Sequence, residues 1–184
     1  SFTPSDFPSS SSDIDQSYLD ALQESYPGLE RLYVSTPMQQ GMIFFGLMDG
    51  NGSSYTSQSH MDLVGNVDVA AFRRAWELSI ARHDVFRTCF VGLESELIHQ
   101  LVVDRVDLPF VEEDWRDIPV DQQEERLQRY RFEDKARGFD FSQAPLMRIS
   151  LIRLSDQRYH FIWTHHHVLM DGWCLPLVFG EVFA

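Results

Sequence analysis

A run of three histidines, set between an aromatic segment and a turn signal, is the most informative stretch of this chain. It reads Phe161-Ile162-Trp163-Thr164-His165-His166-His167-Val168-Leu169-Met170-Asp171-Gly172-Trp173. The β-branched and aromatic residues before the histidines favour a strand, and the Asp-Gly pair favours a turn after it. Because histidine exchanges protons near neutral pH, a strand that displays histidines at its tip is a candidate site for catalysis or metal binding.

Strand geometry separates the three histidines, because successive side chains of a strand point to opposite faces. A strand that continues through the run places His165 and His167 on one face and His166 on the other. One histidine is then expected to act as general base or proton shuttle while its neighbour packs or hydrogen-bonds. Two alternatives remain open. In the first, His165 and His167 bind zinc, although the sequence marks no residue as the third ligand that such a site needs. In the second, the three histidines are polar strand residues without a catalytic role.

The turn residues also allow two interpretations. Asp171 either orients a histidine, as the carboxylate of a catalytic triad does, or ties the turn down through an arginine. Its position four residues after His167 favours the second interpretation. Gly172 supplies the backbone freedom that such a turn needs.

Composition narrows the class of protein. The 184 residues are 43% hydrophobic and 13% aromatic, enough for one domain with a packed core. A net charge of −13, from 15 Lys+Arg against 28 Asp+Glu, argues against a nucleic-acid partner. No apolar run has the roughly 18 residues that a membrane span needs. The two cysteines, Cys89 and Cys174, are too few for a disulfide framework, so we expect a cytoplasmic protein.

Hydrophobic periodicity predicts a mixture of helices and strands. We expect helices over residues 14–25, from Thr36 to about residue 48, after the N-cap residue Asp68, and over residues 121–136 and 175–183. We expect strands over residues 55–64, 85–91, 97–103, 110–112, 146–154 and 158–169, with a hairpin turn at residues 155–157. The last helix has no C-cap before Ala184, so we expect a fragment of a longer domain.

Three segments together resemble a known family. His166-His167-Val168-Leu169-Met170-Asp171-Gly172 matches the H-H-x-x-x-D-G signature of the condensation domains of nonribosomal peptide synthetases. The segments Ser35-Thr36-Pro37-Met38-Gln39-Gln40-Gly41-Met42 and Arg82-His83-Asp84-Val85-Phe86-Arg87-Thr88-Cys89-Phe90 resemble the first two core motifs of that family. The order and the distances are those of the family, and the resemblance runs from about Tyr26 to Ala184. His165 departs from it, in a place that is usually apolar.

The resemblance implies a fold and a set of site residues. The fold would be α/β (an α+β sandwich), a chloramphenicol-acetyltransferase-like lobe with a mixed sheet flanked by helices. Residues 14–184 would be the N-terminal lobe of a condensation domain, without its C-terminal lobe. His167 would be the catalytic histidine, supported by His166, Asp171 and Gly172, with Asp171 paired to an arginine of the second motif, Arg82 or Arg87.

The resemblance also implies the reaction and the partners. Upstream and downstream peptidyl carrier domains would bring an acyl or peptidyl thioester and an aminoacyl thioester on phosphopantetheine arms, and an amide bond would form. We expect no cofactor or metal in the domain itself and an inactive isolated fragment. The alternatives are an epimerisation-domain lobe, which Trp173 after the signature disfavours, and a non-catalytic fragment that only docks carriers.

The first 13 residues are rich in proline and serine and are expected to hold no regular element. Residues 3–8 resemble a string that closes epimerisation or condensation domains in such synthetases. We therefore interpret residues 1–13 as a linker or the tail of an upstream domain, with an epimerisation domain as one candidate for that neighbour.

Overall fold

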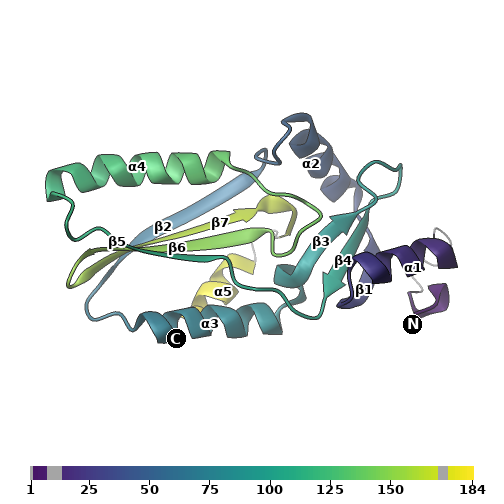
Figure 1. Ribbon diagram of the computed structural model, residues 1–184, viewed down its shortest axis with the longest axis horizontal. Helices are drawn as coiled ribbons and strands as arrows, with labels where there is room; N and C mark the ends of the chain where they lie inside the picture. Colours follow the sequence, from purple (N-terminus) through teal and green to yellow (C-terminus); the bar gives the residue numbers. More distant parts are fainter. Residues whose placement is uncertain (1, 8–13, 170–173) are drawn as a thin grey trace.

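The computed structural model describes residues 2–7, 14–169 and 174–184, which form two sheets and the helices that cover them (Figure 1). The larger sheet has the order β2 (Thr56–Val64), β7 (Arg158–His166), β6 (Met147–Ser155), β5 (Phe110–Asp114). The smaller sheet has the order β1 (Leu29–Val34), β4 (His99–Val103), β3 (Thr88–Val91). Since β5 runs parallel to β6 and the other pairs are antiparallel, the larger sheet is mixed, as predicted.

Helices lie on both faces of the larger sheet (Figure 1). One face carries α4 (Val120–Ala136), and the other carries α3 (Val69–Arg82) and α5 (Cys174–Val182). The helix α1 (Gln16–Ser25) lies beside the smaller sheet, and α2 (Pro37–Met48) lies near one end of the larger one. None of the described helices has the length and apolar character that crossing a bilayer requires.

The strand β7 shows why the sheet is covered on both sides. Its side chains alternate: Trp163 packs on Trp76 of α3, with ring centroids 5.1 Å apart, while Ile162 packs in the cluster under α4 that includes Leu127. Each buried aromatic pair adds about 1 kcal/mol beyond its buried area. The alternation predicted from the sequence is confirmed for residues 161–166.

Two helix starts follow the predicted caps. The Thr36 hydroxyl accepts a hydrogen bond from the Gln39 amide, and the Gln39 side chain accepts one from the Thr36 amide, which forms a capping box with Pro37 in the first turn. The Asp68 carboxylate accepts a hydrogen bond from the Ala71 amide at the start of α3.

The structure differs from the predicted strands in two places. The first is β1, which was not predicted, because a bulge between Leu29 and Arg31 breaks the alternation that marks a strand. The predicted strand over residues 85–91 begins instead as a 3₁₀ helix, η2 (Asp84–Arg87), and only then continues as β3. Side chains hold that turn: Arg87 donates to the Asp84 carboxylate at 2.6 Å, and the Thr88 hydroxyl donates to the Asp84 carbonyl at 2.8 Å.

The described part of residues 1–13 also differs from the prediction. Pro4–Asp6 form a short 3₁₀ helix, η1, in which the Thr3 amide donates to the Asp6 carboxylate at 2.7 Å. Phe7 is buried and packs in a cluster with Leu19 of α1. A segment expected to hold no regular element is therefore ordered where it meets an apolar surface.

A buried ion pair fastens α4 to the sheet. The Asp134 carboxylate accepts hydrogen bonds from Nε of Arg148 at 2.7 Å, from Gln58 Nε2 at 3.3 Å and from the Thr164 hydroxyl. Asp134 and Arg148 have side chains that are 7% and 11% exposed. Because the two side chains have little access to water, the charge of Asp134 and that of Arg148 are stabilised mainly by each other.

Two buried histidines stand near the end of β7. His165 is 2% exposed and stacks on Trp163 with ring centroids 4.6 Å apart, and His166 is fully buried. Burial lowers the pKa of both imidazoles to about 4, so both are neutral at pH 7. His165, to which the family resemblance assigned no role, is buried beside Trp163, and its Nδ1 has no hydrogen-bond partner among the described residues.

We predict that Asp134→Ala lowers the free energy of unfolding by about 3–5 kcal/mol, because it leaves the buried Arg148 guanidinium uncompensated. The exposed neighbour on the same helix supplies the control: Glu133→Ala is expected to change it by less than about 0.5 kcal/mol. Urea denaturation of the two variants measures the difference. Equal losses would contradict a stabilising role for the pair.

We also predict that acid weakens the fold between pH 6.5 and about 4. In this window His165 and His166 are protonated in the unfolded chain but stay neutral in the folded protein, where burial lowers their pKa to about 4. Each histidine then lowers the free energy of unfolding by about 1.4 kcal/mol for every pH unit as the pH falls. Above pH 6.5 the histidines are neutral in both states and this loss is absent. His165→Met removes one titration and should reduce this slope by about that amount in denaturation curves measured across the window. An unchanged slope would rule out His165 burial as a cause.

Candidate functional site

The strand β7 ends at His166, three residues before the predicted end, and His167 begins the 3₁₀ helix η3 (His167–Leu169). The Nδ1 atom of His166 accepts a hydrogen bond from the Val168 amide at 3.0 Å. A side chain that binds the backbone two residues ahead favours a turn over an extended strand. The expectation that His167 shares a strand face with His165 is therefore wrong: His165 is buried and His167 is exposed.

The second nitrogen of His166 is also engaged. Its Nε2 donates to the Ser54 carbonyl at 2.8 Å, while Nδ1 accepts from Val168. This pattern requires the neutral tautomer with the proton on Nε2. Burial holds the pKa of His166 at about 4, which keeps that form at neutral pH. The imidazole thus serves as an anchor for the turn and has no free nitrogen for proton transfer.

Tyr55, which directly precedes the neighbouring strand β2, binds the backbone of His167. The His167 amide donates to the carbonyl of Tyr55 at 2.9 Å. Tyr55 has φ of 62°, in the left-handed region that bulky residues rarely occupy. Such a conformation costs on the order of 1 kcal/mol and persists where neighbouring contacts impose it. The sequence placed Tyr55 in a predicted strand and carried no signal for this role.

The first motif reaches the same turn. Gln39, in the first turn of α2, donates through Nε2 to the Val168 carbonyl at 3.4 Å and to Gln100 Oε1 at 3.3 Å. Val168 is thus bound through its amide N–H by His166 and through its carbonyl oxygen by Gln39. From the sequence, Gln39 was only one residue of a motif, with no task assigned to it.

The second motif completes the surroundings of η3. A cavity of about 210 Å³ adjoins this turn. Residues from all three motifs line it: Gln39 from the first, Asp84, Val85, Thr88 and Phe90 from the second, and Val168 and Leu169 from the third. The three segments recognised in the sequence therefore meet at one place, next to the exposed His167.

The remaining predicted site residues are placed only in part. Asp171 and Gly172 lie outside the described residues. Arg82 is exposed and pairs with Glu181 at 3.2 Å. Arg87 is buried and donates to Asp84 at 2.6 Å and to Glu30 at 2.8 Å. Its Nε is buried and has no partner among the described residues.

The zinc alternative finds no support in the described geometry. Within residues 2–7, 14–169 and 174–184, no three His, Cys, Asp or Glu side chains form a group that could hold a metal ion. His160, a further histidine of β7, has partners at both ring nitrogens: its Nδ1 is 2.7 Å from the Asp62 carboxylate and its Nε2 is 3.0 Å from Arg131 Nη1.

Comparison with solved structures identifies the fold. A four-domain nonribosomal peptide synthetase bound to AMP and glycine superposes with a TM-score of 0.73 at 22% identity, over 84% of this chain and 11% of that one. The starter condensation domain of rhizomide synthetase gives 0.73 at 19% identity, over 83% of this chain and 38% of that one. The predicted chloramphenicol-acetyltransferase-like fold, with a mixed sheet flanked by helices, is confirmed.

Sequence comparison identifies the family. A linear gramicidin synthase of Brevibacillus parabrevis is 39% identical over 183 residues, which is 100% of this chain and 2% of that protein. A mycosubtilin synthase of Bacillus subtilis is 38% identical over 182 residues, or 98% of this chain and 7% of that protein. The chain thus spans a small part of the relatives it matches. The sequence model of the condensation domain matches residues 29–184. The chain therefore belongs to the condensation-domain family of the nonribosomal peptide synthetases.

Proposed function

We propose that this chain supplies the catalytic histidine for amide-bond formation between two carrier-bound thioesters. The observation that carries the proposal is the exposed imidazole of His167 on a turn whose backbone is bound by His166, Gln39 and Tyr55. Family membership supports the class of reaction. A fixed turn lowers the cost of aligning an imidazole with a reacting amine.

The chemistry assigns His167 the role of proton acceptor. The amine nitrogen of the downstream aminoacyl thioester attacks the carbonyl carbon of the upstream thioester, a C–N bond forms and the C–S bond breaks. The proton lost by the amine passes to the imidazole of His167, within about 3 Å of the nitrogen, and then to the leaving thiolate. His166 positions the turn, and we propose Asp171 and Gly172 as the supporting residues of the signature.

The partners follow from the reaction. The substrates arrive on the phosphopantetheine arms of an upstream and a downstream carrier domain, and the condensation domain itself needs no bound cofactor. We further propose that the C-terminal lobe completes the site, so the 184 residues alone form no amide. The low cysteine count fits a cytoplasmic site of action. An upstream epimerisation domain remains a proposal that rests on residues 3–8.

We propose that Asp171 pairs with Arg87 and not with Arg82. Arg87 is 6% exposed and has a buried Nε without a partner among the described residues, whereas the Arg82 side chain is 72% exposed. A carboxylate at Nε would satisfy that buried donor.

We predict that His167→Ala in the full synthetase lowers amide formation about 10²- to 10⁴-fold, the usual contribution of a positioned general base. The measurement follows product formation from two loaded carriers by mass spectrometry. His60→Ala, which removes an exposed histidine of β2, should retain the wild-type rate. Full activity in His167→Ala would refute the proposed role.

We predict that Asp171→Asn lowers both the rate of amide formation and the thermal stability of the domain, because it removes the charge of the proposed pair with Arg87. Arg82→Gln is the matched control and should change neither quantity, since Arg82 forms an exposed ion pair with Glu181. If Asp171→Asn leaves rate and stability intact, the pairing does not exist. If Arg82→Gln has the larger effect, Arg82 is the partner.

A further inference from the structure

The ring of His166 is enclosed by two phenylalanines from residues 138–141, which we call the 138–141 segment. The centroid of the Phe141 ring lies 4.9 Å from that of His166 at an interplanar angle of 80°, and the Phe139 ring lies 6.4 Å away at 83°. These edge-to-face contacts exclude water from the imidazole, which needs its neutral form to hold the Val168 amide.

Phe141 has no room to move away from the histidine. It is 2% exposed, and its carbonyl accepts a hydrogen bond from the Phe90 amide at 2.7 Å. On the side of α2, a Cβ built on Gly46 would lie 2.6 Å from Phe141 Cζ, so only glycine lets the helix approach this closely. The ring is therefore confined by α2 as well as by its contact with His166.

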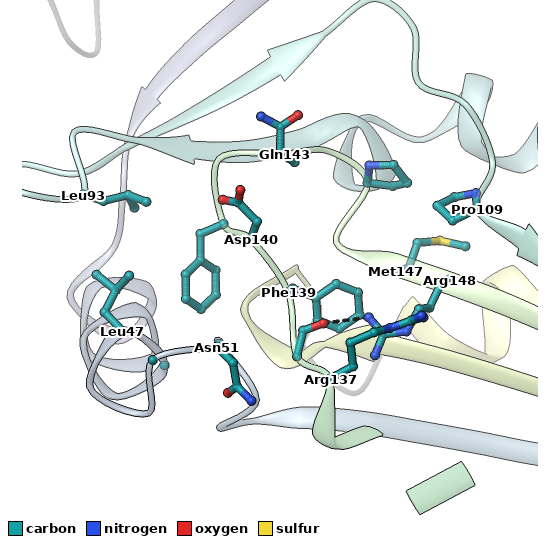
Figure 2. A pocket seen from close by; sticks show the side chains of 16 residues that line it. Leu47, Asn51, Leu93, Pro109, Arg137, Phe139, Asp140, Gln143, Met147 and Arg148 are labelled. Carbon is teal, nitrogen blue, oxygen red and sulfur yellow. Dashed lines mark hydrogen bonds between the residues drawn. The ribbon is translucent and has the colours of Figure 1, made fainter. Parts of the chain in front are cut away.

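Phe139 is fixed by a different set of contacts. The Arg148 guanidinium lies over the Phe139 ring, 4.3 Å from its centroid, and donates through Nη1 to the Gly138 carbonyl at 2.7 Å. The Phe139 amide donates to the Asn51 carbonyl at 3.0 Å. Figure 2 shows Phe139 beside Arg148, at the wall of a cavity of about 600 Å³ that Leu47, Asn51 and Met147 also line.

We infer that the 138–141 segment is a positioning element for His167, which acts by confining the ring of His166. Phe141 and Phe139 hold the imidazole, the imidazole holds the Val168 amide, and that hydrogen bond ends the strand so that His167 stands at the turn. This role of the segment rests on the proposed function of His167. Neither phenylalanine belongs to the three family motifs quoted above, and both act through another residue.

A positioning role has a consequence that ordinary core packing does not. If the enclosure loosens, water reaches His166, the imidazole takes up a proton on Nδ1 at higher pH, and Nδ1 can no longer accept from Val168. Activity should then be lost on the acid side at a higher pH. Of the described residues, His165 and His167 flank this imidazole in the sequence and a charge on His167 lowers its pKa, while the Arg148 guanidinium lies over the Phe139 ring that faces it.

Two variants disturb the enclosure from different sides in the full synthetase. Phe141→Leu removes the ring, and Gly46→Ala pushes against it from α2. The controls are Phe72→Leu, a buried phenylalanine of α3 for which no contact with His166 is found among the described residues, and Gly180→Ala, a helical position in α5 with open space around it. Gly46→Ala is the milder change and keeps the test valid if Phe141→Leu fails to fold.

Two measurements are made on each variant. The first is the pH profile of kcat and KM for amide formation from loaded carriers. The second is the rate at which diethyl pyrocarbonate modifies His166, located by tandem mass spectrometry, which requires no activity. For both test variants we expect kcat to fall about tenfold with KM unchanged, the acid limb to move up by about one pH unit, and His166 to be modified faster. The controls should match the wild type in all of these.

The outcomes separate the inference from the proposed function. If the test variants resemble their controls in kcat, in the acid limb and in His166 protection, the inference is wrong even when His167→Ala is inactive. If His167→Ala is fully active, the proposed function is wrong, and His166 modification alone decides whether the segment encloses that ring. Faster modification without a change in kcat or in the acid limb would show enclosure without positioning and would also overturn the inference.

Discussion

The hydrogen bond from the Val168 amide to Nδ1 of His166 is the constraint on which the site depends. It ends the central strand β7, and it converts the next residues into a turn. It also assigns the two ring nitrogens of His166, since Nε2 must then be the donor to Ser54. The same bond therefore separates a buried histidine that anchors the turn from the exposed His167.

The rest of the fold preserves the conditions for this bond. Helices cover both faces of the sheet around β7, and the buried imidazole remains neutral because its pKa is held at about 4. Gln39 and Tyr55 bind the backbone of the turn from other elements. A hydrogen bond is electrostatically stronger in the protein interior than in water. Burial of His166 therefore strengthens its bond to the Val168 amide.

Local signals in the sequence predicted much of the architecture. Thr36 and Asp68 cap their helices as expected, because capping depends on residues within one turn. The strand at β1 was missed because a bulge removed the alternation that identifies strands. The apolar residues at the start of the second motif favoured a strand, whereas contacts of Asp84 with Arg87 and Thr88 make it a turn.

The sequence by itself determined the family and its three motifs, because these are encoded in residue identity and spacing, and through that resemblance it pointed to His167 as the catalytic candidate. Only the tertiary structure decided how the histidines divide. Alternation along a strand assigned His165 and His167 to one face, but the strand ends at His166. The cause is a set of long-range contacts, such as that between His166 and Ser54, 112 residues apart, and the close approach of Phe141. No local pattern reports such contacts, because they exist only once the chain has folded.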